Sequence, residues 1–141
     1  MYRHETQIRV RYADTDQMRY VYYGNYSAYY EVGRVESLRA LGLTYKSMEE
    51  NGIIMPVLEN WSKYIAPAYY DEMLTIHTII KKLPGVRIKF FYEIYDESDK
   101  LIHQGETTLV FVNKETGRPC HPPEDMITAL APFFPNEKTT G

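Results

Sequence analysis

The order of the predicted secondary-structure elements narrows the folds available to this chain. Residues 5–12 alternate between apolar and polar side chains, a pattern that is typical of a half-buried strand. Residues 25–41 then carry apolar side chains at helical spacing, and the apolar surface is wide enough to be covered on more than one side. Strand patterns dominate the chain after that helix. A single long helix followed by consecutive strands excludes a parallel sheet built from repeated strand–helix–strand units.

Four segments after the helix have strand patterns and are joined by turn sequences. Prolines interrupt and end the first segment, which favours an edge strand or a bend, and the other three alternate or nearly alternate. A sheet that wraps the helix would cover its apolar surface, so the sequence predicts an α+β fold with an antiparallel sheet around one long central helix. Such a sheet leaves an exposed edge, which favours dimerisation. The four segments are residues 53–66, 73–82, 86–96 and 101–113.

Two residues within the predicted helix need a tertiary explanation. Glycine inside a helix costs roughly 1 kcal/mol relative to alanine, so we expect Gly33 to allow the close approach of a neighbouring backbone. Arg34 lies three positions after Glu31, and a partly buried ion pair between them is expected. Gly42 follows the last apolar position and is predicted to end the helix.

The composition is that of one ordinary globular domain spanning residues 1–141. Hydrophobic residues make up 44% of the chain and charged residues 25%, and the net charge of -3 argues against nucleic acid as the main partner. The apolar runs are far too short to span a membrane, and the N-terminal sequence lacks the apolar run of a signal peptide. Cys120 is the only cysteine, so an intrachain disulfide is impossible and a reduced, cytoplasmic location is expected.

Acidic and aromatic residues are concentrated between the first strand and the helix, where residues 12–26 read YADTDQMRYVYYGNY. Asp14 and Asp16 are two positions apart, and four tyrosines follow Asp16 within the next ten positions. By spacing alone, a turn and helix entry without chemistry explains the Asp-Thr-Asp sequence. The alternative is that one acid takes part in a reaction and the tyrosines form part of the wall around it.

These residues carry a family likeness. Tyr-x-Asp-x-Asp, then Val-Tyr-Tyr-x-Asn-Tyr, then Tyr-Tyr-Glu-x-x-Arg-x-Glu resembles the opening of the 4-hydroxybenzoyl-CoA thioesterase-like hotdog proteins. It is most similar to the acyl-CoA thioesterase branch associated with the Tol–Pal gene cluster. The likeness continues to the final Leu-Val-Phe-Val-Asn and so covers most of the chain. It implies a hotdog fold, a homodimer or homotetramer, hydrolysis of acyl-CoA or related thioesters, and no metal or redox cofactor.

The resemblance also implies roles for individual residues. Asp16 matches the family's catalytic aspartate, and Tyr23 falls where relatives hold a tyrosine or a histidine near the reacting carbonyl. Tyr12 and Asp14 match recurrent motif positions.

The chain departs from the family in the loop after Asp16. Relatives usually have a small pair with glycine where this sequence has Met18 and Arg19. This departure alters the expected conformation of the loop and the shape of the pocket.

Hydrolysis of a thioester suits the residues of this segment. The reaction needs an activated water or a carboxylate nucleophile, and Asp16 can supply either role. It also needs donors for the developing oxyanion. Backbone N–H groups around Tyr23, Gly24 and Asn25, at the start of the predicted helix, are the expected donors because unpaired amides there carry partial positive charge.

Substrate contacts are predicted in three regions. Tyr12 and Asn25 belong to the motif, and Tyr22 and Met55 are expected to line the pocket. Basic residues on either side of a predicted hairpin turn, Lys81-Lys82 and then Arg87 and Lys89, could hold the phosphates of CoA, and a solvated face explains them equally well. An acyl-carrier-protein thioester is the alternative substrate.

Two further functions are left open by the sequence. A thioester dehydratase or hydratase usually relies on a histidine near a helix, and residues 5–76 contain none. A non-catalytic hotdog protein that binds acyl thioesters or a protein partner remains an alternative because of the unusual Gln17-Met18-Arg19 loop. The four histidines are scattered without zinc-binding spacing, so no metal site is predicted.

Overall fold

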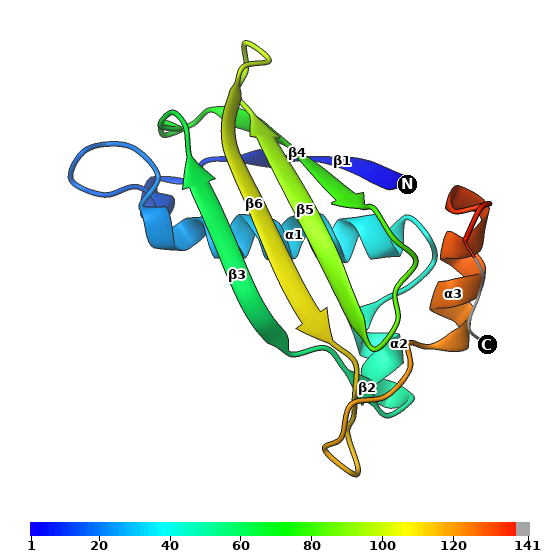
Figure 1. The fold of residues 1–141 in the computed structure, drawn as a ribbon. Helices are drawn as coiled ribbons and strands as arrows, with labels where there is room; N and C mark the ends of the chain where they lie inside the picture. Colours follow the sequence, from blue (N-terminus) through cyan, green and yellow to red (C-terminus); the bar gives the residue numbers. More distant parts are fainter. Residues whose placement is uncertain (138–141) are drawn as a thin grey trace.

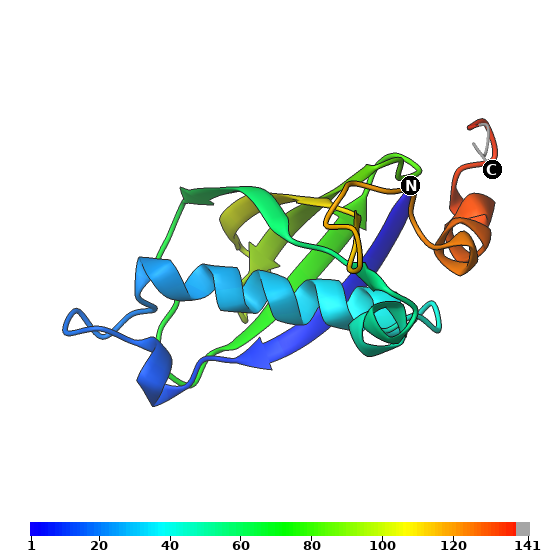
Figure 2. The same cartoon turned by 90° about the horizontal axis from the view of Figure 1, so that it is seen from below.

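The computed structural model describes residues 1–137 and contains a five-stranded antiparallel sheet packed against one long helix (Figure 1). The strand order is β1-β4-β5-β6-β3, so the first strand lies at one edge and β3 at the other. Figure 2 shows the long helix along one face of this sheet. The elements are β1 (Tyr2–Arg9), α1 (Tyr26–Arg39), β3 (Val57–Tyr64), β4 (Met73–Ile80), β5 (Arg87–Tyr95) and β6 (Leu101–Val110).

Shorter elements complete the chain. A two-stranded sheet joins β2 to β7, and α3 lies beside the N-terminus, where the Met1 ammonium donates to the carbonyl of Phe133 at 2.5 Å (Figure 1). No helix among the described residues has the length and apolar character needed to cross a membrane. These elements are α2 (Tyr45–Glu50), β2 (Ile53–Ile54), β7 (Val112–Asn113), α3 (Glu124–Leu130) and three 3-10 turns (Tyr12–Asp14, Tyr23–Asn25 and Ala131–Phe133).

The predicted fold class is confirmed, with changes at element ends. The helix expected over residues 25–41 runs from Tyr26 to Arg39. The strand expected over 53–66 is split at Met55 and Pro56 into β2 and β3. The first strand begins at Tyr2, earlier than expected, because the Tyr2 side chain is buried and its hydroxyl donates to the carbonyl of Ser37 at 2.6 Å.

The core lies between α1 and the sheet. Alternation along β5 turns Ile88, Phe90 and Tyr92 toward the helix, and the ring of Tyr92 stacks on Tyr30 with centroids 4.2 Å apart. Stacked aromatic pairs contribute about 1 kcal/mol beyond the burial of their area. One face of α1 therefore supplies much of the core, and its buried residues are Tyr26, Tyr29, Tyr30, Gly33, Arg34, Ser37 and Leu38.

At Gly33, α1 packs closely against β4. A Cβ atom at this position would lie 2.5 Å from Oγ1 of Thr78 and 3.2 Å from Cγ2 of Ile76. The close approach is to side chains of β4, rather than to the backbone that the sequence suggested. A side chain at Gly33 would force Thr78 or α1 to move.

Arg34 does not form the ion pair with Glu31 that the sequence predicted. Glu31 is exposed, whereas Arg34 is buried and donates to the hydroxyls of Tyr92 at 2.9 Å and Tyr45 at 3.2 Å. Phenolic oxygens thus replace the expected carboxylate as acceptors for this guanidinium.

Candidate functional site

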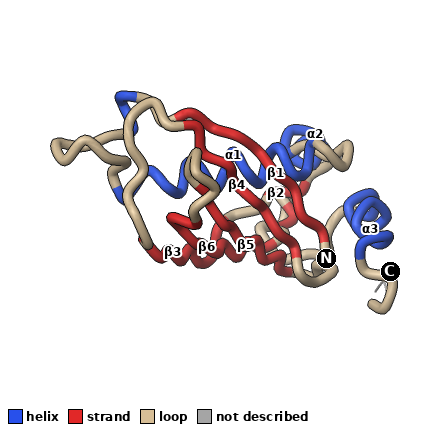
Figure 3. Tube along the Cα trace, turned by 90° about the horizontal axis from the view of Figure 1, so that it is seen from above, coloured by secondary structure: helices blue, strands red, loops and turns tan. Residues whose placement is uncertain are grey.

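The segment between β1 and α1 reverses direction at residues 15–21, which we call the Asp16 turn. Thr15 pairs with Val21, the amide of Asp16 donates to the carbonyl of Tyr20 at 3.0 Å, and the amide of Arg19 donates to the carbonyl of Asp16 at 3.0 Å. The turn projects beyond the N-terminal end of α1 (Figures 1 and 3). These bonds close the turn and leave Asp16 at its base.

Both ends of the Asp16 turn are fixed to the rest of the protein. The amide of Val21 donates to the carbonyl of Ala68 at 2.8 Å, and the amide of Tyr22 donates to the carbonyl of Asp14 at 2.9 Å. The side-chain amide of Asn25 donates to that same Asp14 carbonyl at 2.8 Å. The base of the turn is therefore tied to the body of the fold and to the entry of α1.

The two aspartates of the motif occupy different environments. Asp14 is 5% exposed, and its carboxylate accepts hydrogen bonds from the hydroxyl of Tyr29 at 2.9 Å and from Arg11 through both its backbone amide and its guanidinium. Burial alone would raise the pKa of Asp14, but the hydrogen bonds from Arg11 and Tyr29 outweigh it and lower the pKa. Asp14 therefore has a structural role, because it links Arg11 to Tyr29 of α1.

Asp16 is the acid that faces open space. Its side chain is half-buried, and one carboxylate oxygen accepts the amide of Met18 at 2.8 Å. The other oxygen has no hydrogen bond or ion pair within residues 1–137. Two cavities border this carboxylate, one of about 400 Å³ and one of about 440 Å³.

The first space, which we call the tyrosine cavity, lies between Asp16 and the entry of α1. The ring of Tyr26 stacks on His103 with centroids 3.9 Å apart, and Tyr64 meets both rings edge-on. The Tyr64 hydroxyl also donates to the carbonyl of Tyr23 at 3.4 Å. The wall is therefore built from mutually packed rings. The cavity is lined by Asp16, Tyr20, Val21, Tyr23, Tyr26, Tyr64, Ile65, Ala66 and Pro67.

The second space, which we call the arginine cavity, is bordered mainly by residues of the Asp16 turn itself. Tyr12 borders it, and its ring packs edge-on against Tyr70 with centroids 5.8 Å apart. Most of the other residues around this space carry hydroxyl, amide or charged groups. The full lining is Tyr12, Thr15, Asp16, Gln17, Arg19 and Tyr70.

Backbone amides at the entry of α1 differ in their bonding. The amide of Asn25 donates to the carbonyl of Tyr22 at 2.9 Å. Those of Tyr23 and Gly24 have no acceptor among the described residues. The ring of Tyr22 lies over Gly24, because a Cβ there would be 2.7 Å from the Tyr22 ring. The space beside Gly24 on that side is thus filled by an aromatic side chain, and Tyr23 is the residue of this pair that lines the tyrosine cavity.

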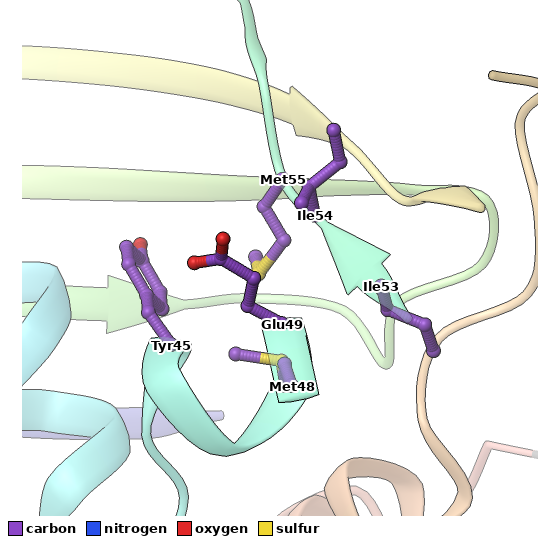
Figure 4. Close-up of a pocket in the computed structure, with 6 residues that line it drawn as sticks. All are labelled: Tyr45, Met48, Glu49, Ile53, Ile54 and Met55. Carbon is purple, nitrogen blue, oxygen red and sulfur yellow. The ribbon is translucent and has the colours of Figure 1, made fainter. Parts of the chain in front are cut away.

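Met55 lies apart from Asp16. It borders a separate cavity of about 180 Å³ between α2 and β2, where the side chains of Tyr45, Met48 and Glu49 face it (Figure 4). Met55 does not line the tyrosine cavity or the arginine cavity, and Asp16 does not line the cavity beside Met55.

The basic residues of the β4–β5 turn form a second separate group. Lys81, Lys82, Arg87 and Lys89 border a cavity of about 500 Å³. Lys81 lies 3.9 Å from the centre of the Phe91 ring, and Lys89 pairs with Glu106 at 3.1 Å. The turn lies at the end of the sheet opposite the Asp16 turn (Figure 1).

The sequence patterns did not indicate the buried polar group behind the tyrosine cavity. His103 is fully buried, its Nε2 shares a short hydrogen bond with the hydroxyl of Tyr30, and that hydroxyl shares a second one with Ser62 at 2.6 Å. Nδ1 of His103 is buried without a partner in the described part of the chain. Burial lowers the pKa of His103 to about 4. The alternation of β6 was the available signal, because it turns His103, Gly105 and Thr107 to one face.

No group of three or more histidine, cysteine, aspartate or glutamate side chains within residues 1–137 is arranged to hold a metal ion. Cys120 is half-buried and lines none of the cavities around Asp16.

Comparison with known proteins gives consistent matches. Residues 10–130 match the family model of the thioesterase-like superfamily. The Bacillus subtilis (strain 168) protein YneP is 36% identical over 113 residues, which are 80% of this chain and 82% of YneP. The acyl-CoA thioester hydrolase YbgC of Escherichia coli O6:H1 is 30% identical over 120 residues, which are 85% of this chain and 90% of YbgC.

A solved structure supports the same relationship. The DHNA-CoA thioesterase from Staphylococcus aureus matches with a TM-score of 0.82 and 33% sequence identity, over 96% of this chain and 86% of that one. The sheet around a central helix, the Asp16 turn and the helix entry thus occur within a fold shared with CoA thioesterases.

Proposed function

This chain is a member of the thioesterase-like superfamily, and we propose that it hydrolyses acyl-CoA thioesters with Asp16 as the reacting acid. The observation that carries the proposal is the tyrosine cavity, because the Asp16 carboxylate and Tyr23, at the entry of α1, border the same space. A carbonyl bound there would lie between this acid and Tyr23, whose backbone amide is unpaired within residues 1–137.

Asp16 has two possible roles at that carbonyl. As a general base, it takes a proton from a water molecule that attacks the carbonyl carbon. As a nucleophile, one of its oxygens bonds to the carbonyl carbon, and water then hydrolyses the mixed anhydride. CoA leaves as a thiolate in both routes, and little assistance is needed because the pKa of a thiol is only about 8.5. The oxygen of Asp16 that lacks a hydrogen bond is the one suited to either role.

Two amides at the entry of α1, those of Tyr23 and Gly24, lack an acceptor in the described part of the chain, and we propose the amide of Tyr23 as the oxyanion donor because Tyr23 lines the tyrosine cavity and Gly24 does not. Both amides lie where the chain enters α1, so they carry partial positive charge. The Tyr64 hydroxyl supports this arrangement by donating to the carbonyl of Tyr23. Donors of this kind typically contribute a factor of about 100 or more to turnover.

The direct test is a thiol-release assay with acyl-CoA substrates of increasing chain length. Wild type is expected to release CoA, and Asp16→Asn is expected to lose at least about 100-fold in kcat while it still folds and binds the substrate. Wild-type turnover in Asp16→Asn would remove this acid from the mechanism. Absence of turnover in the wild type, with retained acyl-CoA binding, would support the non-catalytic alternative.

A thioester hydratase or dehydratase is disfavoured by the position of His103. This histidine does lie against α1, which the sequence did not indicate, but it is fully buried between Tyr26 and Tyr30 and cannot reach a substrate. The thiol-release assay also separates these reactions. A hydratase or dehydratase adds or removes water in the acyl chain and leaves the thioester bond intact, so it releases no thiol.

We also propose that the protein works as a homodimer or homotetramer built through β3. This edge strand exposes apolar side chains on both of its faces, including Val57 at 50%, Leu58 at 46% and Trp61 at 49%. Pairing of β3 with a second copy would bury them and satisfy the open edge. Light scattering should give a multiple of 16.6 kDa. Trp61→Glu should lower the measured molar mass toward that of the monomer. The control Val86→Glu, at an exposed position outside β3, should leave the molar mass unchanged.

The oligomer bears on the basic residues of the β4–β5 turn. Strand β5 has nine residues and separates this turn from the Asp16 end of the sheet by about 30 Å, which is further than CoA extends from its thioester. We therefore propose that Arg87 and Lys89 bind the phosphates of a substrate whose acyl end lies in a neighbouring copy. The double variant Arg87→Ala, Lys89→Ala should weaken inhibition by free CoA and reduce its dependence on salt. Unchanged affinity for CoA would remove these residues from the site.

An acyl-carrier-protein thioester remains the competing substrate, and the Arg87 and Lys89 variant would separate it from CoA because a carrier protein lacks the nucleotide phosphates. A cytoplasmic location is proposed from the lone cysteine, which leaves no intrachain disulfide to form.

A further inference from the structure

Arg19 has an unusual backbone conformation at the tip of the Asp16 turn. Its φ angle is +69°, in the left-handed region that residues other than glycine seldom adopt. The hydrogen bonds between Asp16 and Arg19 and between Asp16 and Tyr20 make residues 17–19 a three-residue hairpin loop, and such loops commonly place a left-handed residue, usually glycine, at the third position. A left-handed residue with a side chain costs about 1 kcal/mol or more. Such strain is retained most often where the side chain has a function.

The side chain of Arg19 is free to meet a ligand. It borders the arginine cavity together with Asp16, and it has no hydrogen bond or ion pair in the part of the chain that the structure describes. Each of the other arginines from Arg3 to Arg39 has an ion pair or a side-chain hydrogen bond. A solvated, unpaired guanidinium is thus positioned beside the acid proposed to react.

Asp16 borders two spaces of different chemistry. The tyrosine cavity has the apolar walls Val21, Ile65 and Pro67 along with its tyrosines. The arginine cavity instead presents the polar side chains of Thr15 and Gln17 and the cation of Arg19. A thioester has two arms that meet at its reacting carbonyl, so a carbonyl at Asp16 would direct one arm toward each cavity.

We propose that Arg19 is a specificity-determining residue that selects thioesters whose acyl group ends in a carboxylate, bound in the arginine cavity. A planar guanidinium binds a carboxylate through paired hydrogen bonds. Its charge also offsets the repulsion that a second carboxylate would meet near Asp16. The phosphates of CoA are the less suitable anion, because the whole pantetheine chain separates them from the thioester. This inference rests on the proposed thioesterase function.

The test compares two substrates of equal carbon number, adipoyl-CoA and hexanoyl-CoA. The ratio of their kcat/KM values is expected to exceed one in the wild type, to fall as salt is added, and to fall about tenfold in Arg19→Gln. Arg19→Lys should keep part of the preference, because it keeps the charge without the planar fork. Lys46→Gln is the matched control, since it removes one exposed cation from α2, at the far end of α1.

The outcomes separate this inference from the function on which it rests. Turnover of both substrates with a ratio that Arg19→Gln leaves unchanged would overturn the inference and keep the thioesterase. An equal loss for both CoA substrates, absent with acyl thioesters of N-acetylcysteamine, would assign the guanidinium to the CoA phosphates and also overturn it. If the wild type hydrolyses neither substrate, calorimetric binding of S-(5-carboxypentyl)-CoA and S-hexyl-CoA gives the same ratio as an affinity, and equal affinities would overturn the inference.

Discussion

The phenolic hydroxyl of Tyr29 donates a 2.9 Å hydrogen bond to the carboxylate of Asp14, and this contact separates the two acids of the Asp-Thr-Asp motif. Asp14 is turned inward to α1, whereas Asp16, two residues later, borders the cavities. The purely structural interpretation of the motif, as a turn and helix entry without chemistry, therefore describes Asp14 well. The chemical interpretation applies to Asp16 alone.

Asp14→Asn should reduce stability more than activity per folded molecule. The substitution removes the charge that accepts from Arg11 and weakens the bond to Tyr29, so the free energy of unfolding should fall by about 1–3 kcal/mol. Urea denaturation measures this change. Asp16→Asn is the matched control, with an expected change below about 0.5 kcal/mol because Asp16 is partly exposed. Equal losses from the two variants would contradict the division of roles.

Arg19→Gly should stabilise the protein. Glycine adopts the φ of +69° found at this position without steric cost, so the free energy of unfolding should rise by about 1 kcal/mol. Met18→Gly is the control, since Met18 has no positive φ and its replacement should lower stability. A stabilised Arg19→Gly variant that also loses the preference for adipoyl-CoA would show that the strain is retained for selectivity.

Gly33→Ala should destabilise the protein although alanine favours helices. The added methyl would approach Oγ1 of Thr78 to 2.5 Å, and the resulting displacement should cost about 1–3 kcal/mol, more than the helix propensity gained. The double variant Gly33→Ala, Thr78→Ala should lose less than the sum of the two single changes. Additive losses in thermal or urea unfolding would mean that the contact with β4 does not govern this position.

His103 should make stability depend on pH between about 7 and 4. Burial lowers its pKa from 6.5 to about 4, so the unfolded chain binds a proton at a higher pH than the folded one. Its contribution is therefore fully present above pH 6.5 and is lost as the pH falls toward 4, by about 3 kcal/mol in total.

The measurement is the free energy of unfolding between pH 7 and pH 4 in the wild type and in His103→Gln. The variant should lack the part of the acid loss that His103 causes, and the exposed histidine variant His121→Gln should retain it. A slope identical in all three proteins would contradict the assigned pKa shift.

The fold could be predicted because the apolar side chains of nearly every element have the spacing that is typical of a helix or a strand. The alternation of β5 and β6 and the helical spacing of residues 25–41 depend only on which side chains face the core. The predicted ends of the elements were less accurate where a single tertiary contact determines the end. Strand β1 begins at Tyr2, for example, whose hydroxyl donates to the carbonyl of Ser37 in α1.

The candidate site was only partly predictable. Local sequence brings Asp16, Tyr23 and Tyr12 together, because all lie within twelve residues of one another. It could not indicate that Met55 lies beside α2, or that Arg87 and Lys89 lie at the far end of the sheet, since these positions follow from the strand order. The partners of Arg34 were also hidden, because Tyr92 is 58 residues away in sequence.

The bonds that fix both ends of the Asp16 turn have a consequence for how such proteins diverge. The amides of Val21 and Tyr22 and the bridge from Thr15 hold the base of the turn in position, while Gln17, Met18 and Arg19 contribute nothing to the core. Mutations at the tip can therefore accumulate without unfolding the domain or displacing its acid. Descendants of one ancestral gene could acquire new substrate preferences through a few codons of this loop.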